Sequence, residues 1–507
     1  MNSPMEALNA IRTIAGNRQT TGIDDATIAR FIELDPSLVA AIEDAAQVHA
    51  ELMTDFADLL KGDEAAASAA LQADFINFYP ANTVNPYISM AASGPWIVTS
   101  HGSVLHDNGG YGMLGAGHSP HQIMEIMGDT HVMANIMTAN FTQKRFSNLL
   151  KAEVGQTHGS CPFSKFICMN SGSESVTVAC RIADVNAKKQ TESGGRHEGR
   201  SIKILSLEGS FHGRTDRPAQ ASDSCIGKYK EHLASHASMN NLITVPPNDV
   251  EALRAAFAAA DSEGVFIEMM LVEPVMGEGD PGLCITREFY DVARELTLAH
   301  GSLFLVDSIQ AGIRGTGFLS IVDYPGFETC TGPDLETYSK ALNAGQYPLS
   351  VLACNDRAAK LYVRGIYGNT MTTNPRALAV GCAVLSGLTQ ETRQNIRDRG
   401  QDFIDELTGL MSEFPGLITK VQGTGLLFSA ELHPSIEVVG YDGIETWLRK
   451  HGLGVIHGGE NSLRFTPHFG ITHEEVALLI DLVRQGIRAF SAGRPLPATN
   501  TSEVAAI

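Results

Sequence analysis

Cysteine is scarce and scattered in this sequence. The 507 residues include eight cysteines, and no two of them form a CxxC pair. Closely spaced cysteines are the usual mark of zinc sites and of the disulfide scaffolds of secreted proteins. The sequence therefore predicts neither a disulfide framework nor a metal ion, and it favours a cytoplasmic location.

Long apolar runs and an excess of positive charge are also lacking. No stretch approaches the ~18 uninterrupted apolar residues of a membrane span, so we expect no membrane association. Residues 1–16 lack the basic segment and apolar core of a secretory signal. With 37 Lys and Arg against 57 Asp and Glu, the net charge is −20. Such a chain has no general attraction for nucleic acid.

What the chain does have is a globular composition and an alternating pattern. It is 43% hydrophobic and 19% charged, and it is long enough for two or three units with their own cores. Between residues 120 and 375, short apolar runs alternate with amphipathic stretches, which predicts an α/β fold with a mostly parallel sheet. The predicted strands are Phe166–Met169, Ile202–Leu205, Met270–Val272, Leu303–Val306 and Leu349–Ala353, and the clearest helices are Asp249–Ala260 and Arg287–His300.

The segments on either side of this region differ from it. In the N-terminal part we expect a helix capped by Asp24 and Asp25, then a long amphipathic helix from Ser37 to Leu59. That helix could pack on the main body, cover a dimer seam or bind a partner. Towards the C-terminus, short strands are expected near Gly425–Phe428 and Ser462–Phe465. The predicted division is 1–75 helical extension, 76–119 irregular N-terminal part of a small domain with active-site loops, 120–375 large domain, 376–495 α+β small domain and 496–507 disordered tail.

The stretch from Leu303 to Lys340 carries the clearest chemical signal. Asp307 ends a buried strand at its carboxyl end, where open α/β sheets bind ligands. Lys340 follows the next apolar run, inside a Ser-Lys-Ala turn. A lysine that forms a Schiff base and an acid that keeps a pyridine nitrogen protonated are what a pyridoxal phosphate (PLP) enzyme needs. Taken alone, a strand-ending aspartate and a surface lysine are also common in α/β proteins without a cofactor.

Three other turns follow predicted strands. Ser171, Gly172 and Ser173 could bind phosphate at a helix start, although such residues also form ordinary caps. The segment GSFHGRT offers an aromatic ring and an arginine, and it could equally be a loop with a buried aromatic residue. The segment VEPVMGEG carries two glutamates, Glu273 and Glu278. In the usual case such a pair is solvent-facing, but beside a cofactor it could hold an arginine away from the substrate. The residues 75–117 are rich in glycine, and Tyr111 and His118 are the candidates there.

Taken together and in order, these segments resemble the class III aminotransferases, the ornithine and 4-aminobutyrate type. The resemblance covers about residues 95–480 and rests on NSGSES, GSFHGRT, VEPVMGEG, VDSIQAG-RGTG, PD-----SKA, TTNP and RFTPHFGIT. It implies PLP fold type I, the aspartate aminotransferase-like fold, with a large domain and a smaller α+β C-terminal domain. It also implies a homodimer with shared active sites.

The resemblance assigns roles to individual residues. Lys340 would form the Schiff base, Asp307 would face the pyridine nitrogen, Gln310 the phenolic oxygen, and Thr370 would reach the phosphate of the neighbouring subunit. The full set of implied cofactor contacts is Gly172, Ser173, Phe211, His212, Asp307, Gln310, Lys340 and Thr370. The catalytic residues are Lys340 and Asp307.

The implied substrate contacts are Arg214, Glu278, Arg464 and Tyr111. Arg464 would bind an α-carboxylate, Arg214 would be a second carboxylate clamp, and Glu278 would pair with Arg464 when a different substrate is bound. The chain departs from the family in three places: Ser308 stands for a glutamate, Thr372 and Thr373 for glycines, and Val84 for a substrate-binding tyrosine.

The predicted function is transfer of an amino group from a terminal amine to a 2-oxo acid, 2-oxoglutarate or pyruvate. Lysine, ornithine, 4-aminobutyrate or a diamine would be the donor. The same fold also supports PLP-dependent racemases, lyases and aminomutases. A non-catalytic homologue that binds a partner through its N-terminal helix is a third possibility, against which the intact Lys340, Asp307 and Gln310 argue.

Overall fold

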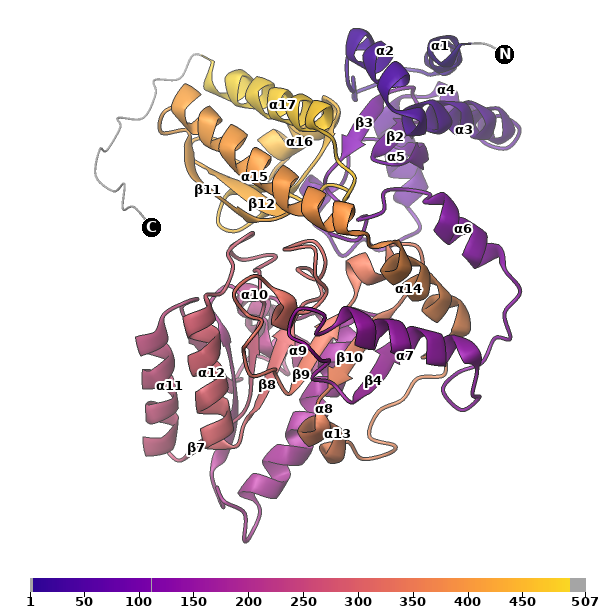
Figure 1. Cartoon of the computed structure of the whole chain (residues 1–507). Helices are drawn as coiled ribbons and strands as arrows, with labels where there is room; N and C mark the ends of the chain where they lie inside the picture. The colour runs from indigo at the N-terminus through magenta and orange to yellow at the C-terminus, as the bar shows by residue number, and fades with distance from the viewer. Residues whose placement is uncertain (1–2, 111, 493–507) are drawn as a thin grey trace.

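The computed structural model describes residues 3–110 and 112–492 (Figure 1). The candidate Tyr111 and the predicted tail at 496–507 therefore lie outside the described residues. Within the described part, no helix has the combination of length and apolar character that crossing a bilayer requires. The main sheet with its helices lies below the N-terminal and C-terminal parts of the chain in the view of Figure 1.

The main sheet has seven strands in the order β4-β10-β9-β8-β7-β5-β6. Only β10 runs antiparallel to its two neighbours, so the predicted, mostly parallel sheet is confirmed. Every residue of β7 and β8 is buried, as expected for strands covered on both faces. The sequence prediction did not include β6 and β9. The strands are β4 (Lys165–Met169), β5 (Ser201–Leu207), β6 (Leu242–Val245), β7 (Val265–Val272), β8 (Leu303–Asp307), β9 (Leu335–Tyr338) and β10 (Ser350–Cys354).

Helices cover both faces of this sheet. Alternate strand residues such as Leu303 and Leu305 pack with α8, whereas Phe304 and Val306 belong to the core that includes α11 and α12. The predicted helix at 287–300 is confirmed. The helices of this region are α7 (Phe141–Glu153), α8 (Gly172–Thr191), α9 (Asp216–Ala221), α10 (Asp223–His232), α11 (Val250–Ser262), α12 (Arg287–His300), α13 (Asp356–Leu361) and α14 (Pro375–Gly387).

The C-terminal part contains an antiparallel sheet in the order β11-β12-β15-β14. The strand expected near Gly425–Phe428 is misplaced, because Gly425 lies in the turn between two strands with φ +55°. A Cβ at Gly425 would lie 2.3 Å from the carbonyl oxygen of Gly315, so this turn packs closely on the loop after β8. The elements are α15 (Gln390–Glu413), β11 (Ile418–Thr424), β12 (Leu427–Leu432), α16 (Ile444–Lys450), β14 (Ile456–Gly458), β15 (Ser462–Phe465) and α17 (His473–Ser491).

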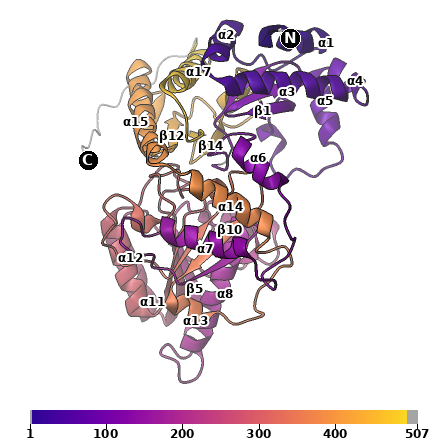
Figure 2. The same ribbon diagram turned by 45° about the vertical axis from the view of Figure 1, so that its right-hand side comes forward.

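The segment expected to be irregular between residues 75 and 117 contains three strands. They form a small sheet in the order β1-β2-β3-β13, and β13 comes from the C-terminal part of the chain. The sequence did not predict these strands because each is short and lies between turns rich in glycine. Residues from the N-terminal and C-terminal parts of the chain therefore share one sheet, and in Figure 2 the N-terminal helices and α17 both lie above the main sheet. The elements are β1 (Ser89–Ser93), β2 (Trp96–Thr99), β3 (Val104–Asp107), α6 (His121–Gly128) and β13 (Leu453–Gly454).

The N-terminal residues form helices that pack on this small sheet. The long helix expected from Ser37 to Leu59 is α3 and ends at Leu52, and a short α4 follows. Asp35, the N-cap of α3, accepts a hydrogen bond from Trp96 Nε1 at 2.6 Å, and α3 lies against β1 and β2. The structure therefore shows the first of the three expected roles of this helix, packing on the main body of the protein. The helices are α1 (Pro4–Ile14), α2 (Asp25–Leu34), α3 (Pro36–Leu52), α4 (Ala57–Lys61) and α5 (Glu64–Gln72).

Candidate active site

A cavity of about 600 Å³ lies at the carboxyl ends of the central strands. Eight residues singled out from the sequence line it, although they come from four separate segments of the chain. They are Gly172, Ser173, Phe211, His212, Arg214, Asp307, Gln310 and Lys340. Thr370, Glu278 and Arg464 do not line this cavity themselves.

Lys340 projects into the cavity from the 3₁₀ turn η3 (Lys340–Asn343) that follows β9. Its backbone has φ +41°, a left-handed conformation that costs a residue with a side chain about 1–2 kcal/mol. The amine donates a hydrogen bond to Gln310 Oε1 at 2.7 Å. Burial lowers the pKa of the Lys340 amine to about 8, and the charge of Arg464 acts in the same direction. Neutral amine is therefore accessible near physiological pH.

Asp307 is held at the end of β8 by three donors. His212 Nδ1 lies 2.8 Å from Asp307 Oδ2, and Thr337 Oγ1 and the Ile309 amide donate to Oδ1 at 3.1 and 3.2 Å. The carboxyl group is 4% exposed. A carboxylate accepts about four hydrogen bonds, so Asp307 keeps capacity for one more donor at the cavity.

The side of the cavity next to β4 is built by the first turn of α8. Ser171 caps the helix, and Glu174 accepts a hydrogen bond from the Ser171 amide at 3.1 Å. The amides of Gly172 and Ser173 come next in that turn, at the positive end of the helix dipole. A Cβ at Gly172 would lie 2.6 Å from Ile309 Cδ1, so only glycine lets this turn approach the loop after β8. The geometry is that of an anion site.

Glu273 has a different role from the two that the sequence indicated, a solvent-facing charge or a carboxylate that holds an arginine away from the substrate. It follows β7, lines the cavity, and accepts from the amides of Phe211 and Gly277, each at 3.2 Å. Burial raises the pKa of Glu273 to about 7, while nearby His212 lowers it. Glu273 thus fixes two loops at once. Its pairing with Glu278 in the sequence was noticed, but its partners are backbone groups that no motif reveals.

The two arginines differ in their surroundings. Arg464 on β15 is 3% exposed and donates to the carbonyl oxygen of Gly277. Arg214 is half-exposed, and its guanidinium lies 3.9 Å from Glu278, 3.4 Å from the Tyr229 hydroxyl and 5.2 Å from the centre of the Phe211 ring. The ion pair that the structure gives for Glu278 is therefore with Arg214.

Helix α10 contributes to the surroundings of Arg214. Its Cys225 Sγ lies 3.5 Å from Arg214 Nη1 and 3.9 Å from Glu278 Oε1, and Tyr229 comes from the same helix. These contacts were missed because no helix was predicted between Asp223 and His232.

The serine that departs from the family pattern after Asp307 has a carboxylate partner. Ser308 Oγ donates to Glu336 Oε1 at 2.6 Å, and the amide of Ile321 donates to the same oxygen at 3.0 Å. Glu336 belongs to the neighbouring strand β9, and burial raises its pKa to about 7. Ser308 is therefore hydrogen-bonded to a buried carboxylate of the neighbouring strand.

A second cavity of about 630 Å³ lies on the side of the N-terminal sheet. Val84 lines this cavity, not the one around Lys340. His118 also lines it and pairs with Asp107 at 3.0 Å, so His118 is placed away from Lys340.

The Lys340 cavity fits pyridoxal phosphate by the chemistry of its groups. It offers a buried amine of lowered pKa, a fixed carboxylate, an aromatic ring and a helix start for an anion. Nε2 of His212 is a buried nitrogen with no hydrogen-bond partner among the described residues. Together with the seven-stranded sheet, this set defines a PLP-dependent enzyme of fold type I.

Comparison with known proteins gives the family. The sequence model described as "Aminotransferase class-III" matches residues 78–487. The chain therefore belongs to the class III aminotransferases, which are PLP-dependent enzymes that transfer an amino group from a donor to a 2-oxo acid.

Related proteins extend over most of the chain. It is 28% identical to the acetylornithine aminotransferase of Neisseria meningitidis serogroup B over 80% of this chain and 96% of that protein. It is 30% identical to acetylornithine aminotransferase 2 of Caulobacter vibrioides over 64% of this chain and 74% of that protein. The ornithine aminotransferase structure from Toxoplasma gondii superposes with TM-score 0.72 at 22% identity, covering 87% of this chain and 98% of that one, which supports the fold.

Proposed function

We propose that this aminotransferase takes its amino group from a terminal amine, as in lysine, ornithine, 4-aminobutyrate or a diamine. The acceptor is a 2-oxo acid, 2-oxoglutarate or pyruvate. The observation that carries the proposal is the pair of arginines near the cavity, one of them with a glutamate beside it. The guanidinium of an arginine binds a carboxylate of the substrate. When a donor with fewer carboxylates is bound, a glutamate beside one arginine can neutralise its unused charge.

The names of the relatives fit this choice of donor. Acetylornithine and ornithine aminotransferases are among the similar proteins, and ornithine carries a primary amine at the end of its side chain.

The residues of this chain divide the work as follows. When bound, the cofactor supplies an electron sink for the donor carbon. Lys340 acts as the general base that takes the proton from that carbon and as the acid that returns it, and a pKa near 8 suits both steps. Asp307, fixed by His212, would hold the ring nitrogen of the bound cofactor, and Phe211 would contact its ring.

The other contacts orient the cofactor and the substrates. The amides of Gly172 and Ser173 bind the phosphate, and Gln310, already hydrogen-bonded to Lys340, reaches the phenolic oxygen. Arg464 binds the carboxylate of the acceptor, and Arg214 clamps a second one.

We also propose a homodimer with shared sites. Thr370 is exposed and accepts from Asn135 Nδ2 at 3.4 Å, so the two loops that carry these residues lie together. Large apolar side chains are exposed on both loops, and a second copy would cover them. They are Val132, Met133, Ile136, Met137, Phe141 and Met371. In this arrangement Thr370 reaches the phosphate in the partner's cavity. The cytoplasmic location stays a prediction from the cysteines, which are all free thiols.

A screen of amino donors tests the function. Purified enzyme is mixed with one donor and no acceptor, and conversion of the bound cofactor to its amine form is followed by absorbance. Diamines, ornithine, lysine and 4-aminobutyrate should convert it, and 2-oxoglutarate or pyruvate should reverse the change. Conversion by α-amines alone would contradict the terminal-amine proposal. A Lys340→Ala protein is the control for changes that do not depend on catalysis.

A further inference from the structure

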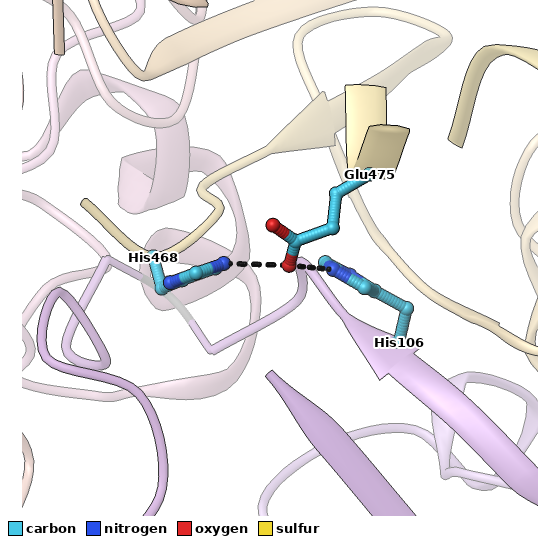
Figure 3. A group of neighbouring side chains, drawn as sticks. All are labelled: His106, His468 and Glu475. Atoms are coloured by element: carbon cyan, nitrogen blue, oxygen red, sulfur yellow. Dashed lines mark hydrogen bonds and ion pairs between the residues drawn. The ribbon is translucent and has the colours of Figure 1, made fainter. Parts of the chain in front are cut away.

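One side chain from the N-terminal part of the chain meets two from the C-terminal part, near the sheet that both parts share. His106 comes from β3, His468 from the loop after β15, and Glu475 from the first turn of α17 (Figure 3). Nε2 of His106 and Nε2 of His468 lie 3.0 and 2.9 Å from the same oxygen, Glu475 Oε1. We propose that this trio is a binding site for a divalent transition-metal ion of the Zn²⁺ type.

The geometry is close to that of a zinc site. Zinc–nitrogen and zinc–oxygen distances of about 2.0–2.2 Å in a tetrahedron place neighbouring ligand atoms about 3.3 Å apart. The three ligand atoms lie within 4.8 Å of one another, so small movements of the two imidazole rings open the site. Two nitrogens and one carboxylate oxygen are ligands that Zn²⁺ accepts, with a water molecule as the fourth.

The carboxylate is fixed with one oxygen facing the histidines. Glu475 Oε2 accepts from the Thr472 amide at 2.7 Å and from its hydroxyl at 2.8 Å, which is the capping box of α17. Oε1 is left to face His106 and His468. A capping box needs only one glutamate oxygen, so the two histidines are not explained by the helix end.

Asn108 provides an independent observation. Its amide lies 2.9 Å from His106 Nδ1, and its Oδ1 is a buried oxygen with no hydrogen-bond partner in the described part of the chain. The two ends of an amide are exchangeable by rotation, and Oδ1 in the place of Nδ2 accepts from Nδ1–H of His106. That tautomer leaves the lone pair of Nε2 for a metal, which is the usual support of a ligating histidine.

Such an ion would connect three elements. It joins β3, the loop that follows Arg464 on β15, and the start of α17. The same loop carries Thr466, whose amide and hydroxyl donate to the carbonyl oxygen of Asn108 at 3.0 and 3.2 Å. The site therefore lies outside the Lys340 cavity but fastens the segment after a substrate arginine. His468 and Glu475 are seven residues apart, but His106 lies 369 residues from Glu475, so no local motif predicted the complete site.

The test uses the untagged holoenzyme after dialysis against a chelator. Titration with Zn²⁺ in a calorimeter should give one site per chain. His468→Gln keeps a donor for Glu475 Oε1 but removes a ligand nitrogen, and it should weaken Zn²⁺ binding at least tenfold. His473→Gln is the matched control, because His473 is exposed, lies on the same helix and is outside the trio. It should bind Zn²⁺ as the wild type does.

A second measurement does not depend on a variant folding well. The Trp96 ring packs against the edge of His106 with centroids 4.9 Å apart, so Co²⁺ in the site should quench Trp96 fluorescence and give visible absorption bands with the same midpoint. Absence of a zinc site in the wild type, equal binding by His468→Gln, or loss of binding in His473→Gln would each overturn the proposal. The trio would then be a hydrogen-bonded cluster only.

Discussion

Replacing Glu273 by glutamine should change how the stability of the fold depends on pH. The folded-state pKa of Glu273 is about 7 because of burial, against a usual value of 4.5. Between these values the folded protein binds more protons than the unfolded chain, so the contribution of Glu273 makes the protein less stable as the pH rises. The full difference corresponds to about 3 kcal/mol, at about 1.4 kcal/mol for each tenfold change in proton affinity.

Glu273→Gln removes this contribution, because an amide has no proton to lose. At pH 5 the variant resembles the protonated acid, and the two proteins should differ by only about 1 kcal/mol, the worth of one backbone hydrogen bond. Between pH 5 and pH 8 the variant should gain about 2–3 kcal/mol relative to the wild type. Glu336 and Glu268 also have pKa values raised to about 7. Both residues are present in the wild type and in the variant, so the difference between their free energies of unfolding reports on Glu273 alone.

The assay is urea unfolding of the cofactor-free enzyme, followed by circular dichroism at several pH values. Glu263→Gln, at an exposed glutamate, is the control and should track the wild type. A difference that stays constant from pH 5 to pH 8 would refute the reasoning. At pH 8 the variant should also have a raised KM for the 2-oxo acid, since the Gly277 loop that receives Arg464 loses one anchor.

Four further outcomes are expected. Lys340→Ala should lose both the visible absorbance of the lysine-bound cofactor and turnover, and wild-type turnover would exclude Lys340 as the reacting amine. Asp307→Asn should slow single-turnover proton abstraction by roughly 100-fold with the fold intact, because a neutral amide does not stabilise a protonated ring nitrogen. Arg464→Ala should cost about 2–5 kcal/mol in kcat/KM for 2-oxoglutarate and much less for a simple diamine, whereas equal losses would assign it to the fold. Light scattering should find the active enzyme as a dimer at assay concentration, and an active monomer would contradict the role of Thr370.

The parts of the site that could be predicted are those that follow directly on a buried strand. Asp307, Glu273 and the Ser171–Ser173 turn each come after a continuous apolar run, and parallel strands bring their carboxyl ends to one edge. For the same reason, the order of apolar runs predicted the main sheet. The strands of residues 89–107 were missed because each has only four or five residues between turn residues.

Contacts between segments distant in sequence could not be predicted in this way. Cys225 and Tyr229 approach Arg214 only because α10 folds back over the loop that carries it. The trio of His106, His468 and Glu475 needs β3, a loop and a helix start from opposite ends of the chain. The pattern of a single sequence predicts which residues are neighbours within one helix or strand. These two sites depend instead on how separate elements pack against each other.

Ser308 departs from the family pattern, and its role becomes clear only from the packing of the strands. In the sequence alone, the serine after Asp307 leaves the PLP assignment intact but weakens any assignment of the substrate. In the fold, β8 and β9 are adjacent and parallel, so Glu336 on β9 reaches the loop after Asp307 and accepts from Ser308. A buried carboxylate needs several donors, and Ser320 and Tyr338 supply the remainder. The loop after Asp307 is therefore tied to the adjacent strand through a carboxylate that stands 28 positions further along the chain. A reading of residues 307 and 308 alone cannot predict this contact, because it depends on which strand lies beside β8.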